Sequence, residues 1–128
     1  MTENLGRIIY KAGAAAYVLW GLLHVYAAYL SFQLASEQDF GPVQSKIFQN
    51  GWNLAYLSVF CIAIAVIYNW KNSVTGYWLN IITISAIDIG FLVLIYWPGH
   101  STDLLGPALW ITGAILTTIG IIFSPRTN

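Results

Sequence analysis

Two residues with proton-exchanging side chains lie inside long apolar segments of the sequence. They are Asp88, in YWLNIITISAIDIGFLVLIYW, and His24, in AGAAAYVLWGLLHVYAAYLSFQL. A carboxyl group and an imidazole form an acid–base couple that can transfer a proton or orient a polar ligand. Because ionisable groups are costly in apolar surroundings, an aspartate in such a segment is by default a candidate functional residue. We therefore take Asp88 and His24 as a candidate catalytic or ligand-orienting pair.

The two candidates are predicted to lie at the same depth and to contact each other. His24 and Asp88 are almost equally far along their segments, which run in the same direction and start near residues 12 and 77. At 1.5 Å per helical residue, both lie about 17 Å in, close to the centre of a hydrocarbon core of about 30 Å. A contact would give Asp88 the partner that a buried carboxylate requires.

Four further residues are candidates for lining a pocket around this pair. Tyr17 and Ser85 share helix faces with His24 and Asp88, Trp20 lies one turn before His24, and Cys61 lies at a similar depth in another apolar segment. The structural alternative is that these residues form the core and that the His–Asp pair only fixes how the helices align.

The segments that position these residues are predicted to be four transmembrane helices. The chain of 128 residues is 58% hydrophobic and 8% charged, whereas soluble domains carry about 25% charged residues. Runs of about 20 apolar residues are long enough to cross a bilayer. They cover residues 12–34, 52–70, 77–97 and 107–123, separated by Gly- and Pro-containing connections. The predicted fold is therefore an all-α integral membrane bundle, with residues 1–128 as a single domain.

The distribution of basic residues predicts the orientation of this bundle. Arg7, Lys11, Lys71 and Arg126 all fall on one side of the membrane, and Lys46 falls on the other. Because cations favour the cytoplasmic side, both termini are expected in the cytoplasm, and the chain is expected in a cytoplasmic (inner) membrane.

Two further features bear on partners. The first outer connection, residues 36–51, contains FGPVQSKIF and fits either a short amphipathic surface helix or an ordinary loop. Gly106, Gly113 and Gly120 recur every seven residues and give the fourth span a smooth face that suits close packing with another helix. Such a face could contact a second copy of the chain or a partner in a membrane complex.

Metal, cofactor and nucleic-acid binding are not predicted. No Cys/His cluster has the spacing of zinc ligands, and no basic cluster favours nucleic acid. His100, Asp103, Glu37 and Asp39 fall on the outer side and could offer metal ligands, but a solvated loop is the favoured interpretation.

Three functions are compatible with these features. The favoured one is a site that binds, and could act by acid–base chemistry on, a lipophilic small molecule such as a lipid, a quinone or a sterol-like compound. The second is a structural or assembly subunit of a larger membrane complex. The third is a proton-coupled transporter of a small solute, with Asp88 as proton carrier. Whether the protein is an enzyme is left open.

Overall fold

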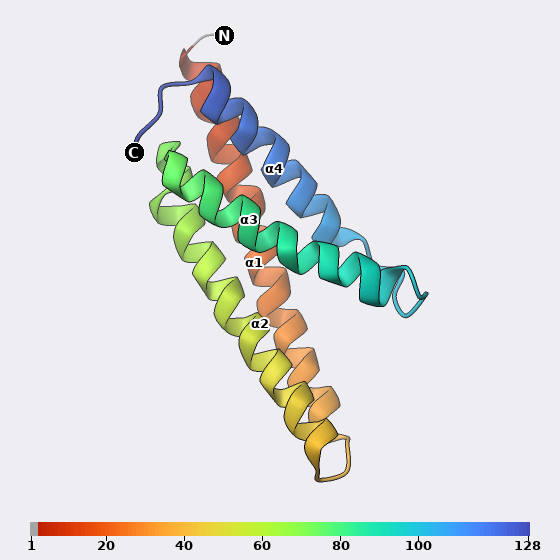
Figure 1. The fold of residues 1–128 in the computed structure, drawn as a ribbon. Coiled ribbons are helices and arrows are strands. Elements are labelled where there is room, and N and C mark those ends of the chain that lie inside the picture. The colour runs from red at the N-terminus through yellow and green to blue at the C-terminus, as the bar shows by residue number, and fades with distance from the viewer. Residues whose placement is uncertain (1–2) are drawn as a thin grey trace.

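The computed structural model describes residues 3–128, and within them the fold is all-helical with no β-strand. Four helices are long and apolar enough to cross a membrane. They follow one another as α1 (Glu3–Ser36), α2 (Pro42–Ile67), α3 (Val74–Phe91) and α4 (Leu105–Phe123), shown in Figure 1. A 3-10 turn, η1 (Asn69–Lys71), follows α2, and a π-helical segment, η2 (Leu92–Tyr96), continues α3. The predicted number of membrane-length helices is confirmed.

Helix α1 is longer than the span predicted for residues 12–34. It begins at Glu3 and has 34 residues, which corresponds to about 51 Å. The added first turns contain Arg7 and Lys11, which are good helix formers although they are not apolar. Hydropathy therefore located the apolar part of this helix but not its ends.

Residues 36–51 do not form a separate surface helix. Residues 42–51 are helical, but they are the first turns of α2, and the connection from α1 is reduced to residues 37–41. Pro42 occupies the start of α2, where its missing N–H costs no hydrogen bond. Helices α1 and α2 consequently form a long hairpin that extends beyond the other two helices (Figure 1).

The turn between α2 and α3 is fastened to the C-terminal end of the chain. Asn72 adopts a left-handed conformation with φ of 56°, and its side-chain Nδ2 donates hydrogen bonds to the carbonyl oxygens of Gly120 and Pro125, each at 2.9 Å. The backbone N–H of Val74 also donates to the carbonyl of Thr127 at 2.9 Å. This turn and both ends of the chain therefore lie at the same end of the bundle (Figure 1).

Glycines let the other helices approach α1 closely. A Cβ atom at Gly113 of α4 would lie 2.5 Å from two atoms of the Tyr17 ring, and one at Gly120 would lie 2.5 Å from Cβ of Tyr10. The glycine face that was expected to suit a partner thus packs against α1 of the same chain. A partner that used this face would have to displace α1.

Helix α3 diverges from the hairpin toward its C-terminal end (Figure 1). Residues 92–95 close a wider helical turn, in which the N–H of Trp97 donates to the carbonyl of Leu92 at 2.8 Å and that of His100 donates to Ile95 at 2.9 Å. The parts of α1 and α2 nearest the connection at residues 37–41 are therefore separated from α3.

Candidate functional site: a buried His–Asp pair beside an apolar pocket

Asp88 is fully buried, with 0% of its surface exposed, at the inner face of α3. Its Oδ2 accepts a hydrogen bond of 2.6 Å from the indole Nε1 of Trp20 on α1. Its Oδ1 has no hydrogen-bond partner within residues 3–128. A buried carboxyl oxygen without a partner is unfavourable unless something else occupies the site, so this atom requires an explanation.

His24 lies next to Asp88, as the sequence predicts. Its Nε2 is 3.9 Å from Oδ1 of Asp88, which is within ion-pair range but too long for a hydrogen bond. Its Nδ1 is 2.8 Å from the backbone carbonyl of Trp20, and its ring stacks on the Trp20 ring with centroids 3.9 Å apart. Trp20 therefore holds both members of the pair.

The pair lies beside the start of α4. Gly106, in the first turn of α4, packs against it, and a Cβ atom there would lie 3.0 Å from Cε1 of His24. The opposite end of α4 packs beside Tyr10, fourteen residues before His24, which is about 21 Å along α1. The pair is therefore nearer the end of the four-helix part of the molecule at which α4 begins.

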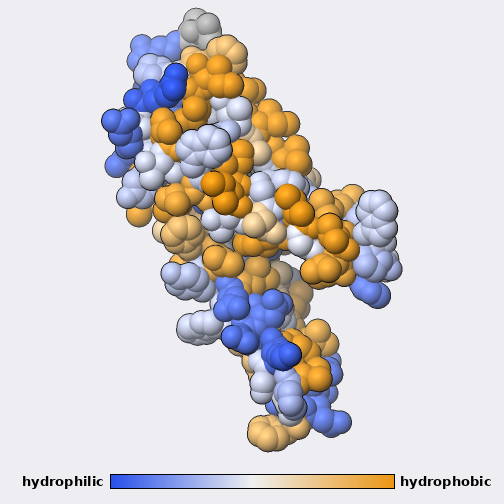
Figure 2. All heavy atoms as spheres, in the orientation of Figure 1, coloured by the Kyte–Doolittle hydropathy of each residue, from blue (hydrophilic) through white to orange (hydrophobic). Residues whose placement is uncertain are grey.

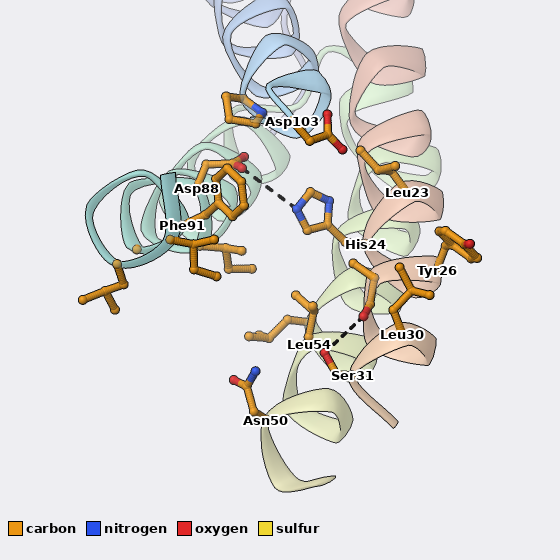
Figure 3. A pocket seen from close by; sticks show the side chains of 18 of the residues that line it. Leu23, His24, Tyr26, Leu30, Ser31, Asn50, Leu54, Asp88, Phe91 and Asp103 are labelled. Atoms are coloured by element: carbon orange, nitrogen blue, oxygen red, sulfur yellow. Dashed lines mark hydrogen bonds and ion pairs between the residues drawn. The ribbon is translucent and has the colours of Figure 1, made fainter. Parts of the chain in front are cut away.

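A pocket of about 620 Å³ adjoins the pair and lies between the hairpin and the diverging α3–α4 connection. His24, Asp88 and Asp103 form one end, and Ser31 and Asn50 line the other (Figure 3). Most of the wall between these ends is apolar, from residues Leu23, Leu30, Leu54, Leu57, Ile87, Phe91 and Leu94. The hollow is visible in Figure 2, with hydrophilic side chains on the hairpin below it.

The four residues expected to line a pocket do not line this one. Tyr17, Trp20 and Cys61 are fully buried and form the core together with Ala65 and Ile84. Ser85 accepts a hydrogen bond of 2.9 Å from Nε1 of Trp110 on α4. These side chains point toward the centre of the bundle, whereas the pocket lies on the outer side of the His24–Asp88 pair.

Sequence reasoning missed the outer half of the site. Asn50, Asn53 and Leu54 belong to the early turns of α2, which were assigned in part to a loop. Gly106 was noted as a packing residue, but its position in front of the pair was not anticipated. Asn50 and Asn53, which are polar side chains in an otherwise apolar helix, were the feature of the sequence that could have indicated this part of the site.

The outer-side residues proposed as alternative metal ligands do not gather in the structure. Asp103 lines the pocket, where its Oδ1 accepts a hydrogen bond of 2.9 Å from the N–H of Leu105 at the start of α4. Nowhere in residues 3–128 are three His, Cys, Asp or Glu side chains placed to hold one metal ion.

Fold and site together define a class: a protein of four membrane-length helices with a buried His–Asp pair at the end of an apolar pocket. The chain matches no family model, and searches of curated proteins and of solved structures find no match. Its function must therefore be inferred from the chemistry of the pocket.

Proposed function

We propose that this protein binds a lipophilic small molecule in the pocket beside His24 and Asp88, with the pair orienting its polar group or exchanging a proton with it. The observation that carries the proposal is the buried, unpartnered Oδ1 of Asp88 at the polar end of a pocket with apolar walls. Small-molecule sites are commonly concave, apolar and about 300–1,000 Å³ in volume, with a few convergent polar groups.

The pocket is open rather than sealed, which supports a ligand that enters from the surroundings. Tyr26, Leu30 and Leu94 line the pocket, and they are 57%, 43% and 70% exposed. Exposed apolar residues at membrane-spanning helices are accessible to lipid, so a hydrophobic molecule can reach the pocket laterally. The polar pair would then fix which end of the molecule points inward.

If His24 and Asp88 only align helices, a folded double variant should keep its function, whereas a binding pair predicts that it loses it. Replacing one partner alone leaves a buried polar group without compensation, whereas replacing both removes the problem. The variant His24→Leu/Asp88→Leu should therefore be no less stable than the less stable of the two single variants. This allows loss of binding to be separated from loss of fold.

The proposal is tested by native mass spectrometry of the protein released gently from membranes. We expect the wild type to carry a small-molecule adduct that the folded double variant lacks. Ala27→Phe, which places a large side chain in the pocket without changing the polar pair, should lose the same adduct. An adduct retained by both variants, or absent from the wild type, would contradict a binding function.

A further inference from the structure

The pocket is lined by carboxyl groups and a histidine, but by no permanent cation among the described residues. Two carboxyl side chains, those of Asp88 and Asp103, face it, and the described residues that line it include no Lys or Arg. Both lie at the same end, together with His24 (Figure 3). A charge in surroundings of low polarity is stabilised mainly by a nearby opposite charge, and the pocket itself supplies no permanent cation.

The free hydrogen-bonding atoms of His24 and Asp88 at this end are both acceptors when His24 is neutral. A carbonyl oxygen can only accept, so the Nδ1 of His24 must carry the proton that it donates to the Trp20 carbonyl. In the neutral imidazole, the Nε2 that faces Asp88 is then an acceptor. When Asp88 is ionised, its carboxylate is also an acceptor, and its Oδ1 has no donor within the described residues. The ligand must therefore bring the donors.

The glycine at the start of α4 packs closely against both acceptor groups. A Cβ atom at Gly106 would lie 3.4 Å from Nε2 of His24 and 3.5 Å from Oδ1 of Asp88. Any side chain at this position would occupy the space in front of both acceptor atoms. The two acceptors are 3.9 Å apart, so one nitrogen or oxygen atom can lie within about 3 Å of each.

We infer that the ligand is a cationic amphiphile, with an ammonium head at the His24–Asp88–Asp103 end of the pocket and an apolar body along its walls. This inference rests on the proposed function and specifies its ligand class. The N–H groups donate to Oδ1 of Asp88 and Nε2 of His24, and the positive charge balances the carboxylates. A neutral alcohol provides a donor but leaves the charge uncompensated, and a fatty acid is repelled. The apolar body contacts Leu30, Leu54 and Phe91.

The test compares three probes of equal chain length: decylamine, decyltrimethylammonium and decanol. Binding is measured by isothermal titration to protein in phosphatidylcholine nanodiscs, with empty nanodiscs subtracted to remove partitioning into lipid. Because a charge-assisted hydrogen bond exceeds a neutral one, decylamine should bind at least about tenfold more tightly than decanol. Decyltrimethylammonium, which has the charge but no N–H donor, should fall between them.

Variants assign this preference to the site. Asp88→Asn should reduce the difference between decylamine and decanol to less than about threefold, since the amide oxygen still accepts but carries no charge. Asp103→Asn, whose amide oxygen can still accept the hydrogen bond from the N–H of Leu105, should reduce it by a smaller factor. Asp39→Asn is the matched control, because this exposed carboxylate of the first outer connection does not line the pocket.

The outcomes separate the inference from the proposed function. Equal binding of decanol and decylamine, both abolished by Ala27→Phe, would overturn the cationic ligand and leave the lipophilic pocket standing. A preference for decylamine that persists unchanged in both Asp88→Asn and Asp103→Asn would also overturn it. If no probe shows binding that Ala27→Phe removes, the binding function and the ligand class both fail.

Discussion

Trp20 connects the two residues of the candidate site at the scale of single side chains. It donates to Oδ2 of Asp88 through its indole N–H, accepts from His24 through its backbone carbonyl and stacks on the His24 ring. It is fully buried and contributes nothing to the wall of the pocket. Its role is therefore to position the pair that a ligand would contact.

Replacing Trp20 with Phe is expected to destabilise the protein by about 1–3 kcal/mol. The phenyl ring fills only part of the space of the buried indole, and the carboxyl group of Asp88 loses its donor. A buried polar group without a partner alone costs an amount of this order. The free energy of unfolding in mild detergent, measured by urea denaturation, checks this value. Trp110→Phe is the matched control.

The control variant removes an indole N–H whose acceptor is the hydroxyl of Ser85, a neutral group in a half-buried position. Its cost should be smaller, because the hydroxyl is neutral and less completely buried. Equal destabilisation by the two variants would mean that the Trp20–Asp88 hydrogen bond contributes no more to the free energy of unfolding than the Trp110–Ser85 one.

The two main residues of the site could be predicted from the sequence, but the atoms through which they make contacts could not. Asp88 stands out because its segment contains no other charge, and its depth selects His24. Which atoms meet depends on how each helix is rotated about its axis, and apolar residues on every side of a membrane helix give little information on rotation. Trp20 was consequently expected in a pocket wall, although its N–H points to Asp88.

At the scale of helices, the packing of α4 against α1 sets the position of Gly106 in front of the pair. The contact relies on glycines because α1 presents bulky rings, such as that of Tyr17, to α4. The hydroxyl of Tyr17 also lies 3.4 Å from the Oγ1 of Thr117, which adds a polar contact between these helices. The glycine repeat of α4 therefore works within one chain.

A methyl group at Gly113 is expected to destabilise the bundle by about 1–3 kcal/mol, since its Cβ would overlap the Tyr17 ring and force it to shift. Gly113→Ala can be measured by thermal unfolding in nanodiscs. The matched control is Gly90→Ala in α3, where an added Cβ meets nothing within 4 Å. This control should be neutral or slightly stabilising, because alanine favours the helix. Destabilisation by Gly90→Ala alone would contradict the observed packing.

Helix existence was predictable, whereas helix ends and divergence were not. Apolar runs of membrane length identify four helices because few other structures satisfy the backbone in lipid. Residues 42–51 contain Gln44, Lys46 and Asn50, so hydropathy could not show that they continue α2. The divergence of α3, which opens the pocket, arises from tertiary packing that no pattern in the sequence records.

At the scale of the whole molecule, its two ends differ in both charge and shape. The end with both termini also holds the α2–α3 turn and carries Arg7, Lys71 and Arg126. The opposite end holds the tip of the α1–α2 hairpin (Figure 1). The pocket lies between this hairpin and the α3–α4 connection. Orientation in the membrane therefore decides from which side the pocket is reached.

We expect the termini to lie in the cytoplasm and the pocket to open toward the opposite side, because Lys and Arg favour cytoplasmic segments. Single cysteines test this in a Cys61→Ala background, where the buried native thiol is removed from the core. Thr102→Cys in the α3–α4 connection and Asn50→Cys at the pocket should react with a membrane-impermeant maleimide added to intact cells. Asn128→Cys should react only after permeabilisation, and it serves as the control for membrane integrity.

Because α2 and α4 fix the relative positions of these sites, Thr102 and Asn50 must respond together. If the cysteine at position 128 is labelled in intact cells and those at positions 102 and 50 are not, the orientation is the opposite of the expected one and the pocket lies on the cytoplasmic side.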